Sequence, residues 1–145
     1  MSTQQTINGA GGCLCRAVQY EVRGELRPII CCHCEQCRKI SGHYVAATAC
    51  KTENLNLIVE HGLHWYQSSP KARRGHCKEC GSSLFWEPTD ADYTSILAGT
   101  LTRPTGLKIS QHIYVHMSSD YYSIDDGLPQ HKEEGYPSYY SEKTT

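Results

Sequence analysis

The segment Cys77-Lys78-Glu79-Cys80-Gly81 is the strongest local signal in the sequence. Two thiolates three residues apart on a tight turn can both reach one metal ion, at about 2.3 Å for zinc. Gly81 follows, where a positive φ lets the backbone curl round a sulfur and donate N–H bonds to it. A redox pair is the alternative, but it is typical of a strand-to-helix junction in a βαβ pattern, and no such pattern is visible. We interpret the segment as half of a zinc site.

Cysteine is frequent in this chain, with nine residues in 145. The count is odd, so complete pairing in disulfides would leave one thiol over. Close spacing suits an ion held by neighbouring thiolates better than it suits disulfides, which gain most by closing long loops. We therefore expect metal ligation. The cysteines form clusters, with one residue alone: Cys13 and Cys15; Cys31, Cys32, Cys34 and Cys37; Cys77 and Cys80; and the isolated Cys50.

Two cysteines on alternate residues, Cys13 and Cys15, follow a Gly-Gly pair. In an extended segment both side chains would face the same way. The pair alone is weak evidence, because buried thiols on one strand face are common. Beside Cys77 and Cys80 it is the natural other half of a four-thiolate site. Four thiolates saturate tetrahedral zinc, so this site would be structural.

The segment Cys32-His33-Cys34-Glu35-Gln36-Cys37 offers three thiolates within six residues. Cys34 and Cys37 would share one face of a helical turn, with Cys32 before it. Three thiolates leave one position of a tetrahedron vacant, and catalytic zinc needs such a position. We therefore expect a second, open metal site here.

A fourth protein ligand would close this second site. Cys31, His33 and Cys50 are the candidates, and spacing does not exclude them. His33 lies between two ligands and is expected to point away, and Cys31 has the same difficulty. Spacing also leaves open which clusters share an ion. Keeping each cluster whole gives one four-ligand site and one three-ligand site.

The chemistry of an open three-thiolate zinc follows from its single net negative charge. A thiol that arrives as fourth ligand loses its proton and stays nucleophilic. We therefore expect formation or cleavage of a carbon–sulfur bond at a carbonyl carbon. Metal-activated water is the weaker alternative, because three thiolates make zinc a poorer Lewis acid than three histidines do.

Basic residues flank the cysteine clusters. They could offset the negative zinc–thiolate charge or hold a substrate carboxylate. A solvated basic face is the simpler interpretation. The residues are Arg38, Lys39, Arg73 and Arg74.

Short β-type runs dominate the rest of the sequence. Their spacing, and the turns between them, predict an all-β fold built of small sheets with short helical turns. The best helical signal covers 34–40 and ends near Gly42, where glycine can take a left-handed cap position. The expected strands are 17–22, 43–49, 55–60, 63–67, 83–86, 93–98, 112–116 and 121–124.

The length of 145 residues is enough for one domain with its own core. We expect a flexible N-terminus at 1–10, a zinc domain at 11–130 and a C-terminal tail at 131–145. A formal charge of −1 gives no strong attraction to nucleic acid or to an anionic membrane. No apolar run approaches the roughly 20 residues that span a bilayer. Residues 1–12 lack the pattern of a signal peptide, so a cytoplasmic location is expected.

Five groups of residues carry a resemblance to a known family. They are Gly12-Cys13-Leu14-Cys15 with Ala17-Val18-Gln19-Tyr20; Cys32-His33-Cys34-Glu35-Gln36-Cys37-Arg38 with Ser41-Gly42; Cys77-Lys78-Glu79-Cys80-Gly81-Ser82-Ser83-Leu84; Ala98-Gly99-Thr100-Leu101; and His112-Ile113-Tyr114-Val115 leading to Asp126-Gly127-Leu128-Pro129. In order and approximate spacing they resemble the glutathione-dependent formaldehyde-activating enzyme family, which also contains centromere protein V. The resemblance runs from about Gly11 to Pro129.

The resemblance implies an Mss4-like fold and two zinc ions per chain. By similarity, the structural zinc is bound by Cys13, Cys15, Cys77 and Cys80. By similarity, the second, catalytic zinc is bound by Cys32, Cys34 and Cys37. The implied function is that of a carbon–sulfur lyase resembling S-(hydroxymethyl)glutathione synthase. Such an enzyme joins or cleaves a glutathione-like thiol and an aldehyde such as formaldehyde.

Two non-enzymatic hypotheses stand beside this one. A zinc-binding module that contacts a protein partner is the first, since Mss4-like domains support both roles. A thiol-based sensor is the second, since Cys31 and Cys50 lie outside the matched clusters. A fourth protein ligand at the second zinc would favour the binding module, and redox-dependent loss of zinc would favour the sensor.

Three positions depart from the family's usual residues. Arg16 stands where glycine is usual, His43-Tyr44 replace a small residue and proline, and Tyr121-Tyr122 stand where tryptophan is common. We expect these positions to flank the substrate pocket.

Overall fold

The computed structural model describes residues 6–134, which form ten strands and one α-helix. The helix is α1 (Glu35–Ser41), and three 3-10 turns are η1 (Thr52–Asn54), η2 (Ala98–Thr100) and η3 (Val115–Met117). The strands are β1 (Ile7–Gly12), β2 (Gln19–Arg23), β3 (Ile29–Cys32), β4 (Val45–Lys51), β5 (Leu55–Val59), β6 (Leu63–Ser69), β7 (Ala72–Cys77), β8 (Ser83–Pro88), β9 (Tyr93–Leu97) and β10 (Ile109–Ile113). The predicted all-β fold is confirmed.

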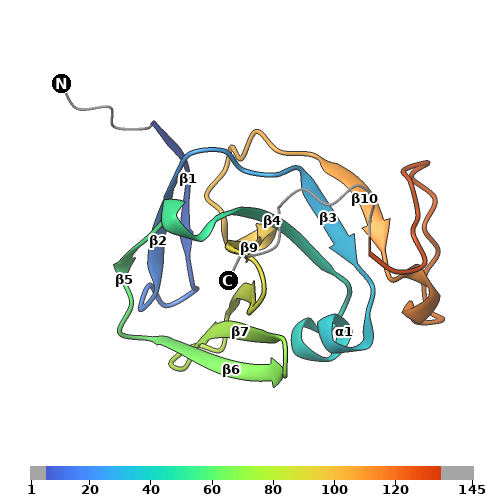
Figure 1. The fold of residues 1–145 in the computed structure, drawn as a ribbon, viewed down its shortest axis with the longest axis horizontal. Coiled ribbons are helices and arrows are strands. Elements are labelled where there is room, and N and C mark those ends of the chain that lie inside the picture. Colours follow the sequence, from blue (N-terminus) through green and yellow to red (C-terminus); the bar gives the residue numbers. More distant parts are fainter. Residues whose placement is uncertain (1–5, 135–145) are drawn as a thin grey trace.

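The described strands form two sheets. The smaller has the order β1-β2-β5, and the larger has the order β10-β3-β4-β9-β8-β7-β6. The paired strands are antiparallel except for β10, which lies parallel to β3. The small sheet and β10 lie at opposite sides of the molecule, and α1 lies near the ends of β6 and β7 (Figure 1).

The main core lies where the small sheet meets the large one. Tyr20 and Val22 alternate on β2 and are fully buried, together with Phe85 of β8. The Tyr20 and Phe85 rings meet edge to face, with their centroids 5.4 Å apart. Cys13 and Cys77 belong to the same buried cluster. Packing in the core therefore holds Cys13 and Cys77 close together, although they belong to two separate cysteine clusters of the sequence.

Helix α1 has the ends that the sequence predicts. Cys34 is the N-cap, and its sulfur accepts a hydrogen bond from the Cys37 N–H. Gly42 is the C-cap in the left-handed conformation, at φ 90°, and its N–H donates to the Arg38 carbonyl at 2.7 Å. A side chain at this φ would be strained, which explains why the helix stops at a glycine.

Three strands were missed and one was predicted wrongly. β1 has three glycines and β7 has two arginines where β-branched residues are usual, and β3 has only four residues, two of them cysteines, so the three patterns are weak. Residues 121–124 form a turn and irregular chain, so that strand prediction is wrong. The strand expected at 112–116 ends at Ile113, because Tyr114 turns left-handed at φ 55°.

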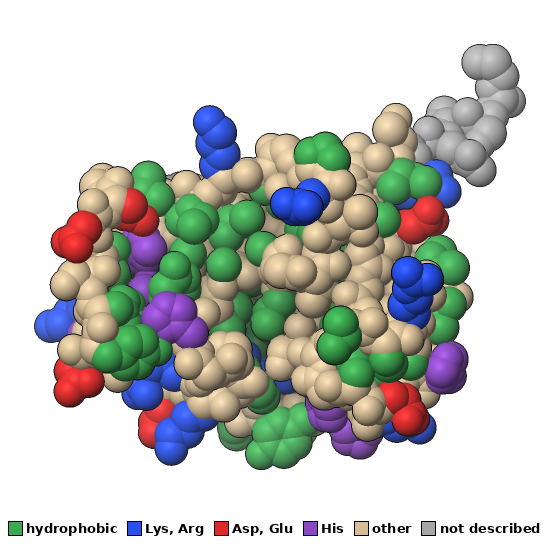
Figure 2. Space-filling view, turned by 180° about the vertical axis from the view of Figure 1, so that it is seen from behind, with side chains coloured by type: hydrophobic (Ala, Val, Ile, Leu, Met, Phe, Trp, Pro, Cys, Tyr) green, Lys and Arg blue, Asp and Glu red, His purple; other side chains and the backbone are tan. Residues whose placement is uncertain are grey.

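The expected flexible N-terminus and C-terminal tail fall partly outside the described residues, at 1–5 and 135–145. Across 6–134, no helix is both long enough and apolar enough to cross a membrane. Basic and acidic side chains are interspersed around the face shown in Figure 2, where neither sign forms an extended patch.

Gly11 is where β1 approaches η2 most closely. A Cβ at this position would collide with the Thr100 carbonyl and lie 2.6 Å from the Tyr20 hydroxyl oxygen. We therefore expect Gly11→Ala to lower the free energy of unfolding by about 1–3 kcal/mol. Gly99→Ala is the matched control, because a Cβ there meets nothing within 4 Å. Urea denaturation of the metal-loaded proteins measures both, and equal stability would contradict this packing.

Candidate metal centres

The fold brings together four cysteines that we call the first group: Cys13, Cys15, Cys77 and Cys80. Their sulfurs lie within 4.8 Å of one another. The Sγ atoms of Cys13 and Cys15 are 3.7 Å apart, as are those of Cys15 and Cys77. A tetrahedral ion with bonds of about 2.3 Å separates its sulfur ligands by about 3.8 Å. A disulfide needs about 2.0 Å, and all these cysteines are free. The group therefore fits a four-coordinate metal ion.

The Cys13–Cys15 half of the first group differs in shape from the expectation. Residues 14–15 form a turn, so the prediction that Cys13 and Cys15 lie in an extended segment is wrong. Cys13 is buried and Cys15 is exposed. The Val18 N–H donates to the Cys13 sulfur at 3.2 Å, and its carbonyl accepts from the Cys13 N–H at 3.0 Å. A tight loop therefore presents both sulfurs to Cys77.

The Cys77–Gly81 half is a tight turn closed by glycine. Gly81 has a φ of 82°, as predicted. Its N–H donates to the Cys77 carbonyl at 2.8 Å rather than to a sulfur. Glycine is needed here for its backbone conformation, because a side chain would be strained at this φ.

Ser82 joins the two halves of the first group. Its hydroxyl accepts from the Leu14 N–H at 3.0 Å and lies 3.2 Å from the Cys80 sulfur. Hydrogen bonds from the side chain and backbone of Ser82 lower the pKa of Cys80 to about 5. A lowered pKa favours the thiolate form of Cys80, which is the form that metal ligation requires.

Three further cysteines form the second group: Cys32, Cys34 and Cys37. Cys32 ends β3, Cys34 caps α1, and Cys37 lies in the first turn of α1. Their sulfurs also lie within 4.8 Å of one another. The Cys37 N–H donates to the Cys34 sulfur at 3.4 Å. A single strand-to-helix junction thus gathers three thiols.

The proposed fourth ligands all lie outside the second group. Within residues 6–134, the cluster contains three donor side chains. Cys31 is fully buried on β3, and Cys50 belongs to the main core. His33 turns both ring nitrogens away, to Tyr122 and His112. The donor set therefore fits an ion with one position left for another molecule.

Arg74 neutralises charge at the second group. Its side chain is buried, with 8% exposure, and its two terminal nitrogens lie 3.9 and 3.8 Å from the Cys37 sulfur. Hydrogen bonds from Cys32 and Cys37 lower the pKa of Cys34, and Arg74 lowers it further by electrostatic attraction. A solvated basic face is therefore the wrong interpretation for Arg74.

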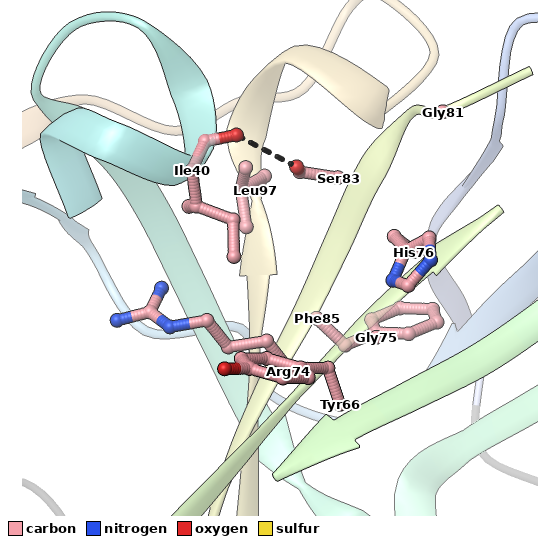
Figure 3. A pocket seen from close by; sticks show the side chains of 9 residues that line it. All are labelled: Ile40, Tyr66, Arg74, Gly75, His76, Gly81, Ser83, Phe85 and Leu97. Atoms are coloured by element: carbon pink, nitrogen blue, oxygen red, sulfur yellow. Dashed lines mark hydrogen bonds between the residues drawn. The ribbon is translucent and has the colours of Figure 1, made fainter. Parts of the chain in front are cut away.

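A pocket of about 270 Å³ opens beside the second group (Figure 3). Arg74 lines it and contacts Cys37, and Leu97 lines it and packs against the same cluster. The Nε atom of Arg74 is buried and has no hydrogen-bond partner in the described structure. The lining residues are Ile40, Tyr66, Arg74, Gly75, His76, Gly81, Ser83, Phe85 and Leu97.

The departures noted in the sequence do not line this pocket. Arg16 lies in the loop of the first group. His43, Tyr44 and the pair Tyr121-Tyr122 cluster round His33 instead. The expectation that these positions flank the substrate pocket stays a prediction. Sequence reasoning also missed the contact of His33 with Tyr122, because 89 residues separate them.

Comparisons with known proteins place the chain among similar sequences and folds. The model of a family described as glutathione-dependent formaldehyde-activating enzyme matches residues 8–117, a range that contains both cysteine groups. An uncharacterized lyase of Schizosaccharomyces pombe is 34% identical over 80 residues, which cover 55% of this chain and 58% of the yeast protein. The match thus spans a little over half the length of this curated relative.

A solved structure resembles the fold. A Rhodobacter sphaeroides protein of known crystal structure matches with a TM-score of 0.54 and 23% sequence identity. The superposition covers 69% of this chain and 97% of that chain. At this identity the likeness concerns the fold alone.

Arg16 is strained by the loop that carries Cys15. It is exposed and has a φ of 72°, a left-handed conformation that costs a side-chain-bearing residue about 1–2 kcal/mol. We expect Arg16→Gly to raise the free energy of unfolding of the metal-loaded protein by about 0.5–1 kcal/mol. Arg16→Ala removes the same charge but keeps the Cβ, so it should bring no gain. An equal gain in both variants would assign the effect to charge and refute the backbone explanation.

Proposed function

This chain belongs to the glutathione-dependent formaldehyde-activating enzyme family, and on that basis we propose that it is a zinc-dependent carbon–sulfur lyase. Its substrates are a glutathione-like thiol and an aldehyde such as formaldehyde, which it joins or cleaves. The catalytic domain would comprise residues 11–130. The observation that carries the proposal is a group of three thiols, rather than four, beside a pocket.

The two cysteine groups take different roles in this proposal. The first group holds a structural zinc, because four thiolates complete its coordination. The second group holds the catalytic zinc through Cys32, Cys34 and Cys37. Thiolates favour zinc over hard cations such as magnesium. A reducing compartment such as the cytoplasm would keep these nine free thiols available.

A metal ion held by Cys32, Cys34 and Cys37 would supply one coordination position for a substrate thiol, which would bind as a thiolate and remain nucleophilic. Cys32, Cys34 and Cys37 hold that position at the β3–α1 junction. Arg74 offsets the negative charge of the sulfurs. The pocket receives the rest of the thiol substrate, and Arg74 forms part of its wall.

The reaction balances without any other co-reactant. In the joining direction, a bond forms between the thiol sulfur and the aldehyde carbon. The thiol gives up its proton, and the carbonyl oxygen takes up a proton as it becomes a hydroxyl. In the cleaving direction, the hydroxyl loses its proton and the carbonyl re-forms as the carbon–sulfur bond breaks. The sulfur leaves with the bonding electron pair as a thiolate and takes up one proton to give the thiol.

A non-catalytic zinc module is the competing function. It predicts a fourth protein ligand at the second group, and the group within residues 6–134 has three. A module of that kind would also have no use for a pocket that shares Arg74 and Leu97 with the second group. These observations favour the lyase.

Cys34→Ser tests the role of the second group. Zinc content should fall from two ions per chain to one, because one ligand of the open site is lost while the first group is intact. We expect turnover of glutathione and formaldehyde, followed by nuclear magnetic resonance of the adduct, to fall by about 100-fold or more. The variant should remain folded, which circular dichroism checks.

Cys50→Ala is the matched control for this experiment. Cys50 is buried in the main core and lies outside both groups, so its loss should leave two zinc ions and full turnover. The proposed function fails if wild-type protein with two zinc ions accelerates neither adduct formation nor adduct cleavage. It also fails if Cys34→Ser loses its zinc and keeps full turnover.

A further inference from the structure

Four side chains form a continuous hydrogen-bonded chain beside the second group. Tyr122 bonds to Nδ1 of His33 at 2.5 Å, and Nε2 of His33 bonds to Nδ1 of His112 at 2.9 Å. Nε2 of His112 bonds to a carboxylate oxygen of Asp126 at 2.7 Å. Both histidines are buried, with 0% and 3% exposure. The proposed function does not use this chain, although His33 stands between two of the cysteines.

With His112 neutral, the protons of these four hydrogen-bonded side chains have one consistent order. An ionised Asp126 can only accept, so His112 donates to it through Nε2–H. Nδ1 of a neutral His112 then accepts from Nε2–H of His33. Nδ1 of His33 is left as an acceptor for the Tyr122 hydroxyl. Every ring nitrogen has one partner, so neither imidazole can rotate without losing a hydrogen bond in a buried site.

A backbone hydrogen bond and a neighbouring aromatic ring also hold His33 in place. The His33 N–H donates to the Ile113 carbonyl at 3.0 Å. The Tyr44 ring lies 4.7 Å from the imidazole, centroid to centroid. A shift of His33 would also move Cys32 and Cys34, because these residues adjoin it in the polypeptide.

We infer that the chain of Tyr122, His33, His112 and Asp126 positions Cys32 and Cys34 as metal ligands. Tyr122, His112 and Asp126 are positioning residues, because they act on the cysteines through His33. The 121–126 segment thereby controls how tightly the second group holds its ion. The inference rests on the proposed metal at the second group and not on the proposed reaction.

Tyr122→Phe tests the inference at one end of the chain. It removes the hydroxyl that Nδ1 of His33 requires while keeping the ring. We expect zinc affinity at the second group to fall about 10- to 100-fold, measured by competition with a chromogenic chelator. The first group should keep its affinity and serves as an internal reference. Cobalt(II) in the second group should also show an altered visible spectrum, because the sulfurs are no longer fixed.

Tyr121→Phe is the matched control. Tyr121 lies in the same segment as Tyr122, but its hydroxyl bonds to Nδ1 of His43, at 2.5 Å, and not to His33. Both metal affinities and the cobalt spectrum should therefore match the wild type. Asp126→Ala, which removes the acceptor at the other end, should weaken the second group in the same direction as Tyr122→Phe.

Three results would overturn the inference. One is equal zinc affinity of the second group in Tyr122→Phe and Tyr121→Phe. Another is a parallel loss at both groups, because that reports general destabilisation. The third is a single zinc in the wild type, which refutes the metal assignment on which the inference rests. Absence of turnover in a two-zinc protein would refute the lyase function alone.

Discussion

The structure depends on four thiols that must share one small volume although they come from distant parts of the chain. Cys15 and Cys77 are 62 residues apart in sequence and 3.7 Å apart at their sulfurs. Cys13 and Cys77 are also part of the main core. A metal at this point would link the β1–β2 turn to the β7–β8 turn, so that metal binding and packing of the two sheets stabilise each other. We therefore expect the first group to stabilise the fold rather than to bind substrate.

The second group is built differently from the first. Its three cysteines come from one continuous strand-to-helix junction, so they need no long loop closure. Their charge and orientation are set by side chains from other elements. Arg74 of β7 faces Cys37, and the chain that ends at Tyr122 and Asp126 holds His33. A three-donor group with such support, next to a pocket, suits a site that exchanges a ligand during turnover.

Local patterns in the sequence predict those structural features that depend on residues close together in the sequence. The cluster spacing indicates metal ligation, and the family resemblance divides the cysteines into the two groups that the structure brings together. Gly42 marks the end of α1 because its φ is positive. Contacts between distant residues could not be predicted, such as Arg74 with Cys37 or His33 with Tyr122, because they arise from tertiary packing. The wrong strand at 121–124 has the same origin. Its tyrosines have high strand propensity, but their rings pack round the histidines instead.

We propose that the first group holds a metal ion with four thiolates, whereas the second group leaves one coordination position open. X-ray absorption at the zinc edge of the two-zinc protein distinguishes the two cases, because it counts sulfur ligands at about 2.3 Å. We expect a mean of about 3.5 sulfurs per zinc, rising to about 4 when glutathione is added. A mean of 4 before any thiol is added, or no rise on addition, would contradict it.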